Sequence, residues 1–96
     1  MASVTWTLQA LDDLEAVCLY IARDAPRIAE MFAVRAFEVT DQLVEFPLSG
    51  RIVPEVSRED IREIFLHSYR IIYRFKSNEV EILTIHHGAR LLPALS

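Results

Sequence analysis

The sequence predicts one α+β domain in which a pair of helices covers one face of a mainly antiparallel sheet. Three observations support this fold class. The 96 residues suit a single domain with one hydrophobic core. Apolar residues recur at helical spacing in the first half of the chain, and from residue 61 to residue 87 their period changes to two. Two amphipathic helices need a common apolar neighbour, and the second half of the chain supplies it.

The first elements are a short strand and a helix. Residues 4–8 are β-prone, and a helical pattern begins at Gln9. Pro26 disfavours helical geometry at the preceding residue, so this helix should end near Asp24. The apolar stripe that predicts it consists of Leu11, Leu14, Cys18 and Ile21.

A second helix should start at Pro26, because the first turn of a helix tolerates proline. Its apolar residues repeat at spacings of three and four, and Pro47 and Gly50 should end it. The link between the two helices is short, which predicts an antiparallel hairpin. The apolar stripe of this helix is Ile28, Phe32, Ala36, Val39, Leu43 and Phe46.

Three strands should follow, over residues 60–67, 69–76 and 80–87. Ser77 and Asn78 suit a two-residue turn between the last two strands, and this turn fixes the pairing of the strands. In each of the two charged pairs that result, a basic residue then lies opposite an acidic one, which supports the register. The expected pairs are Lys76 with Glu79, Phe75 with Val80, Arg74 with Glu81, Tyr73 with Ile82 and Ile71 with Thr84.

The same register assigns side chains to the two faces of the sheet. The face under the helices should carry Tyr69, Ile71, Tyr73, Phe75, Val80 and Ile82, with His86 opposite Tyr69. The other face should carry Arg70, Ile72, Arg74, Glu81, Leu83, Ile85 and His87. An exposed sheet face that mixes arginine with aliphatic residues implies a binding partner. Residues 51–59 have no clear period and should connect the second helix to the sheet.

The formal net charge of −4 is unevenly distributed. Residues 1–50 carry three basic and eight acidic side chains, whereas residues 51–96 carry seven basic and six acidic ones. An anionic partner would therefore meet the second half of the chain. An acidic protein gains little from the counterion release that drives general nucleic-acid binding, which counts against a simple DNA- or RNA-binding module.

Cysteine count and hydropathy limit the compartment and the chemistry. Cys18 is the only cysteine, which excludes an intrachain disulfide. Adjacent His86 and His87 should point to opposite faces of a strand, so we expect no metal site. The longest apolar run, residues 16–22, is too short to span a membrane, and no signal segment opens the chain. We expect a cytoplasmic protein without a cofactor and without a membrane partner.

Several short motifs follow one another along nearly the whole chain. They are Asp13-Leu14 with Tyr20, Pro47-Leu48-Ser49-Gly50-Arg51, Ile61-Arg62-Glu63, Tyr69-Arg70-Ile71-Ile72-Tyr73-Arg74 and His87-Gly88-Ala89-Arg90. In this order and spacing the chain resembles the RelE/ParE superfamily of toxins of type II toxin-antitoxin systems, and in particular its ParE-like branch. The resemblance implies one domain over residues 1–96. Its fold would be a short N-terminal strand and an antiparallel helix hairpin on one face of a three- to four-stranded, mainly antiparallel sheet.

The resemblance also implies a function. ParE-like toxins inhibit DNA gyrase without a nuclease site, a cognate antitoxin holds them inactive, and such systems serve in plasmid stabilisation. RelE-like members instead cleave mRNA in the ribosome, and in that alternative Arg70, His87 and Arg90 would be catalytic. The lysine pair and the terminal tyrosine of those enzymes have no equivalent here, since Lys76 is the only lysine. A further alternative is a non-toxic homologue that acts only as a co-repressor bound to its antitoxin.

We expect no catalytic residues, and no sequence-specific nucleic-acid binding without the antitoxin. Arg62 and Arg70 could also have a purely structural role, paired with Glu63, Glu81 or a carbonyl group. The candidates for contact with the antitoxin or the target are Arg51, Arg62, Arg70, Ile72, Leu83, Ile85, His87, Arg90, Leu91 and Leu92.

Overall fold

Two helices pack on a five-stranded mixed sheet in the computed structural model, which describes residues 1–88. The elements are β1 (Ser3–Trp6), α1 (Leu8–Ala22), α2 (Pro26–Asp41), the short 3-10 helix η1 (Gln42–Val44), β2 (Arg51–Ile52), β3 (Ile61–Leu66), β4 (Tyr69–Lys76) and β5 (Glu79–His87). Among these residues, neither helix is long and apolar enough to cross a membrane. The α+β class, the helix hairpin and the three predicted strands are confirmed.

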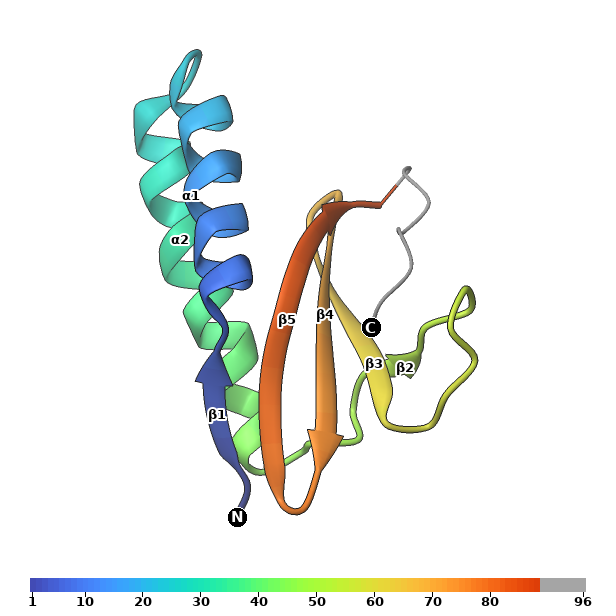
Figure 1. Ribbon diagram of the computed structural model, residues 1–96. Coiled ribbons are helices and arrows are strands. Elements are labelled where there is room, and N and C mark those ends of the chain that lie inside the picture. The colour runs from blue at the N-terminus through green and yellow to red at the C-terminus, as the bar shows by residue number, and fades with distance from the viewer. Residues whose placement is uncertain (89–96) are drawn as a thin grey trace.

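The strands lie in the order β1-β5-β4-β3-β2. β1 runs parallel to β5, and the other neighbouring strands are antiparallel. The helix hairpin lies on one side of the sheet, and the chain between β2 and β3 lies on the other (Figure 1). The sheet has five strands, whereas three or four were expected. The additional strand is β2, because Arg51 and Ile52 pair with β3 although they belong to a segment without a period.

Both helices begin close to where the sequence predicts. The Thr7 side chain accepts a hydrogen bond from the Ala10 backbone N–H and so caps the start of α1. The same hydroxyl group donates to the Ile82 carbonyl of β5 and thereby links the start of α1 to the sheet. α2 starts with Pro26 in its first turn. It ends earlier than expected, at Asp41, because η1 takes over there, and Phe46 is exposed beyond it.

The β4-β5 hairpin has the predicted turn and four of the five predicted pairs. Ser77 and Asn78 both have positive φ angles, 54° and 59°, as the favoured two-residue hairpin turn requires. The register then shifts between Tyr73 and Ile72, so that Ile72 lies opposite Thr84. The predicted pairing of Ile71 with Thr84 is therefore wrong, and the physical reason is a β-bulge, which places an extra residue on one strand.

The main core lies between the helices and the sheet. Its buried residues come from both helices and from β3, β4 and β5, and half-buried side chains such as Trp6, Val17 and Tyr69 pack against them. The buried members are Ala2, Ala10, Leu14, Phe32, Ala36, Leu43, Leu66, Ile71, Tyr73, Val80, Ile82 and Ile85.

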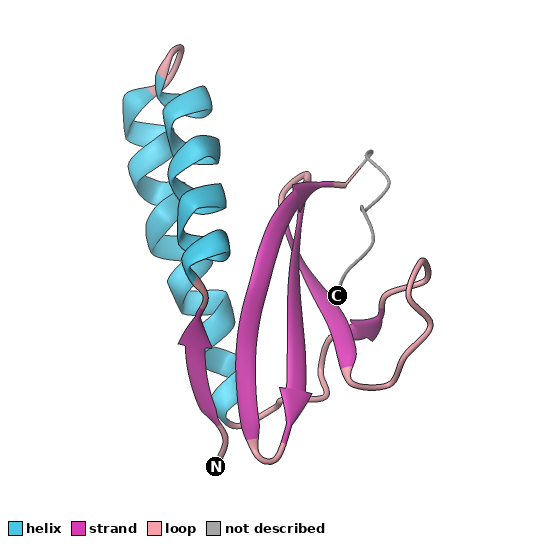
Figure 2. Ribbon diagram, viewed as in Figure 1, coloured by secondary structure: helices cyan, strands magenta, loops and turns pink. Residues whose placement is uncertain are grey.

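A second, smaller core lies on the other face of the sheet. Val53 packs on Ile61 and Ile72, all three fully or almost fully buried, with Val56 and Leu83 at the margin. The residues between β2 and β3, a long loop in Figure 2, thus cover a face that we expected to be exposed. The prediction is wrong because a segment without periodicity can still supply single apolar residues to a core.

Candidate functional site

Arg70, one of three residues that would be catalytic in the nuclease alternative, is almost completely buried. It lies on β4, between Phe65 of β3 and His86 of β5, and only 4% of its surface is exposed. Its Nε donates to Glu63 at 2.5 Å, and its two terminal nitrogens donate to the two carboxylate oxygens of Glu55 at 2.7 and 2.8 Å. Each nitrogen of the guanidinium group therefore already binds a carboxylate of the same chain.

Glu63 connects this pair to a third charged residue. One of its oxygens accepts from Arg70, and the other accepts from the Nε of Arg51, also at 2.5 Å. The Glu63 side chain is fully buried, whereas the Arg51 side chain is 56% exposed. The Arg51 guanidinium carbon also lies 5.0 Å from the centre of the Phe65 ring, within the range of a cation-π interaction. Glu55, Glu63, Arg70 and Arg51 thus form one ion-pair network, which we call the arginine network.

The arginine network stabilises the charged form of Arg70. The hydrogen bonds to Glu55 are the largest effect and raise the pKa of the guanidinium group; burial lowers it, and Glu63 raises it further. A buried charge is tolerated when it is paired and hydrogen-bonded, and this pairing meets that condition. The arrangement supports the structural alternative for Arg70, and the predicted pairing with Glu63 is confirmed.

The two histidines lie on the faces opposite to those predicted. Tyr69 lies opposite His87, and Arg70 lies opposite His86. The rings of Tyr69 and His87 meet edge to face with their centres 5.4 Å apart. The assignment of His87 to the arginine face is therefore wrong, because the bulge moves every later residue of β5 by one position.

The apolar contact candidates are also placed differently from the prediction. Ile72 is fully buried under the loop between β2 and β3, and Leu83 is half-buried beside it. Ile85 is buried in the main core, on the helix side. The predicted exposed face of Ile72, Leu83 and Ile85 is thus wrong within residues 1–88. Arg90, Leu91 and Leu92 lie outside the described residues.

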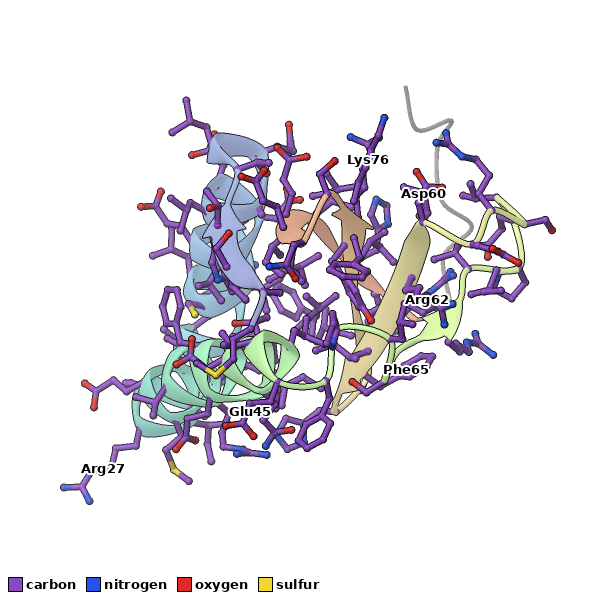
Figure 3. All side chains as sticks on the ribbon, turned by 90° about the horizontal axis from the view of Figure 1, so that it is seen from below. Arg27, Glu45, Asp60, Arg62, Phe65 and Lys76 are labelled. Carbon is purple, nitrogen blue, oxygen red and sulfur yellow. The ribbon has the colours of Figure 1, made fainter. Side chains whose placement is uncertain are left out.

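Arg62 binds backbone rather than a charged partner. It donates to the carbonyl groups of Gly50 and Glu59 at 3.0 Å, so the predicted pairing with a carbonyl group is confirmed, and contact of Arg62 with a partner stays a prediction. Arg62 and Phe65 lie on the side of the molecule away from Arg27, which projects from the hairpin (Figure 3).

Sequence reasoning missed Glu55, the partner that closes the arginine network. The acid is in the segment without periodicity, so no spacing connects it to Arg70. The sequence does contain a signal for Glu63. This acid alternates with Ile61 and Phe65 along the strand, at a position where an apolar residue is expected. Among residues 1–88, no group of three His, Cys, Asp or Glu side chains could hold a metal ion.

Two hollows border the helix hairpin. The larger, of about 800 Å³, lies between α1 and the ends of β4 and β5, and Asp13, Tyr20, Tyr69 and His87 are among its lining residues. The smaller, of about 330 Å³, is mostly apolar. Its lining residues are Ile21, Ile28, Met31, Phe32, Arg35, His67, Ser68 and Tyr69.

This fold, a helix hairpin on a five-stranded mixed sheet, is that of type II toxins of the ParE/RelE superfamily. Residues 4–92 match the family model described as the ParE toxin of the type II toxin-antitoxin system, parDE. The chain belongs to this family.

Relatives and solved structures agree with the assignment. The chain is 37% identical over 91 residues to Toxin RelE2 of Caulobacter vibrioides, covering 95% of this chain and 100% of that one. It is also 37% identical over 92 residues to Y4kP of Sinorhizobium fredii, covering 94% and 92%. The fold is similar to a chain of the chromosomal ParDE system from P. aeruginosa, with TM-score 0.76, 24% identity and coverage of 91% and 96%. It is also similar to a chain of the toxin-antitoxin complex RelBE2 from Mycobacterium tuberculosis, with TM-score 0.57, 28% identity and coverage of 90% and 96%.

Proposed function

We propose that this toxin is a ParE-like inhibitor of DNA gyrase that acts in the cytoplasm, has no catalytic activity of its own and is neutralised by a cognate antitoxin. The observation that carries the proposal is the pairing of Arg70 with Glu55 and Glu63. An mRNA endonuclease needs a cation that can stabilise the phosphate in the transition state. The arginine at the position that matches those enzymes instead binds carboxylates of its own chain.

The charge distribution supports the same proposal. The chain has a net charge of −4, and its only lysine, Lys76, lies at the end of β4 beside the hairpin turn. Docking to ribosomal RNA depends on electrostatic attraction, to which an acidic protein contributes little. Binding to a protein target needs no such attraction.

The surface of the helix hairpin supports an antitoxin partner. Both hollows border this hairpin, and large apolar side chains remain exposed along it. An amphipathic antitoxin segment could bury them, and the excess of acidic residues in the first half of the chain favours a basic segment. The exposed apolar residues of the hairpin are Leu8, Leu11, Leu19, Tyr20, Ile28, Met31, Val34 and Phe37.

Supercoiling by purified gyrase tests the proposal. Increasing amounts of the toxin should inhibit supercoiling, and the antitoxin should restore it. Arg51→Ala removes a cation whose side chain is 56% exposed and should raise the concentration for half-inhibition about tenfold, the effect of losing about 1.4 kcal/mol of binding. Because Arg51 also binds the buried Glu63, the variants are compared at equal concentrations of folded protein. Arg27→Ala, which removes a cation from the hairpin, is the matched control and should leave this concentration unchanged.

The alternatives give different results. Primer extension on translated mRNA would reveal cuts at codon positions if the protein were a RelE-like nuclease, and such cuts would overturn the proposal. Folded protein that is harmless in cells and inert toward gyrase would instead support a co-repressor that only binds its antitoxin.

A further inference from the structure

Arg70 is bound at its Nε by an acid other than Glu55. Its Nε binds Glu63, whose side chain is fully buried and is held on its other oxygen by Arg51. The two terminal nitrogens point to Glu55, and this bidentate geometry is the one in which guanidinium groups bind external carboxylates. The two terminal nitrogens of Arg70 thus form a pair of parallel donors, which we call the fork.

Glu55 reaches this fork from a more exposed part of the chain. It lies between β2 and β3, and its side chain is 26% exposed, whereas the side chains of Arg70 and Glu63 are 5% and 0% exposed. The segment rests on the sheet through Val53 and Val56, which belong to the second core. Removing the Glu55 side chain would therefore open a route to the fork without removing the anchor of the loop.

The charges of the arginine network define the ligand that fits. Among residues 1–88, the four side chains of the network carry two positive and two negative charges, and without Glu55 they carry one net positive charge. This leaves room for a single negative charge. A nucleic acid brings many charges to a site with one uncompensated cation and a buried carboxylate, in a chain of net charge −4, whereas an acidic side chain brings one.

We propose that Arg70 forms a carboxylate-binding site, that Glu55 is its internal ligand, and that an external carboxylate binds there when the Glu55 side chain is absent. Because Glu55 is tethered, its effective concentration at the fork exceeds that of a dilute competitor. The wild-type site is therefore closed to small anions. An acidic residue of a partner protein would have to displace Glu55 to reach Arg70.

Chemical rescue of Glu55→Ala by acetate tests this site. At constant ionic strength, acetate should shift the Arg70 Nε-Hε signal saturably in NMR spectra of the variant. It should also raise the ratio of folded to unfolded variant about tenfold when its concentration exceeds the dissociation constant tenfold. Wild-type protein and Glu59→Ala, which removes an exposed acid of the same loop, should show neither effect.

Each other outcome overturns the proposal. A variant that does not respond to acetate lacks the site, and an equal response of the wild-type protein means that Glu55 does not fill it. If Glu55→Ala is unfolded in chloride, acetate should restore its folding, and failure to do so contradicts the proposal. A stronger response to dimethyl phosphate would assign the site to phosphodiesters. These measurements use no gyrase, so their result is independent of the proposed function.

Discussion

The hydroxyl group of Tyr73 accepts the backbone N–H of Gly50 at 3.0 Å, 23 residues away along the chain. The same hydroxyl donates to the Pro47 carbonyl at 2.8 Å. A Cβ atom on Gly50 would lie 2.6 Å from the Tyr73 oxygen and 2.7 Å from the Glu63 carbonyl oxygen. Glycine is therefore required here by the close approach of a strand and a side chain. Pro47 and Gly50 lie in the connection between η1 and β2, and Arg51 is the first residue of β2, so the geometry of this connection accounts for their spacing.

Replacing Tyr73 by phenylalanine should lower the free energy of unfolding by about 1–3 kcal/mol, because it leaves the buried Gly50 N–H without its partner. Urea denaturation of both proteins measures the difference. Tyr20→Phe removes a hydroxyl group from an exposed tyrosine and is the matched control. Equal stability of the two variants would contradict the role of the Tyr73 hydroxyl.

The same tyrosine predicts a loss of stability at high pH. Burial raises the pKa of Tyr73, against smaller lowering effects of the Gly50 hydrogen bond and the charge of Arg62. Above about pH 10 the unfolded chain releases the proton while the folded protein keeps it, so unfolding becomes more favourable as the pH rises. Denaturation between pH 9 and pH 11 should reveal a decline that is steeper in the wild-type protein than in Tyr73→Phe. Parallel pH profiles would count against this assignment.

Replacing Arg70 by glutamine should cost about 3–5 kcal/mol, because Glu63 and Glu55 lose a buried partner. Arg35→Gln breaks the pair with Glu38, whose side chains are both about half exposed, and should cost only about 0.2–0.5 kcal/mol. Thermal or chemical denaturation compares the two. A cost for Arg70→Gln as small as that of the control would mean that the network does not stabilise the fold.

Asp13 fastens α1 to the bulge of β5, since one of its carboxylate oxygens accepts from the Thr84 hydroxyl group and the Ile85 N–H. Asp13→Ala should destabilise the protein by about 1–3 kcal/mol, because both donors are left without this partner. Asp12→Ala removes an exposed acid one position earlier and should change stability little. Hydrogen exchange at Ile85 gives a local readout, and unchanged protection of this amide in Asp13→Ala would refute the prediction.

The sequence predicts the elements well because their signals are local. Pro26, the apolar stripes and the Ser77-Asn78 turn are all visible within a few residues, and the helix starts and the first four hairpin pairs agree with them. The bulge has no such signal. It is fixed by how β5 packs on α1, including the bonds of Asp13 to Thr84 and Ile85, and a shift of one position exchanges the faces of His86 and His87.

The arginine network was predictable only in part for the same reason. Glu63 is an acid at an inward strand position, on the same sheet face as Arg70 of the neighbouring strand and diagonal to it, so its pairing with Arg70 agrees with the strand pattern. Glu55 and Val53 lie in a segment whose path depends on tertiary contacts, and periodicity carries no information about it. The sequence therefore indicates the cation of the candidate site but not the carboxylate that occupies it.

The parallel pairing of β1 with β5 has a consequence for how the toxin is made. Ser3 lies beside Glu79, and Trp6 lies beside Ile82, so the first strand finds its neighbour only in the last one. At a translation rate of about 5–20 residues per second, roughly 4–15 s separate the synthesis of the two strands. Until then the nascent helices have no complete sheet to cover. The complete sheet can therefore form only after β5 has been synthesised, and a fragment that ends before β5 lacks the strand with which β1 pairs.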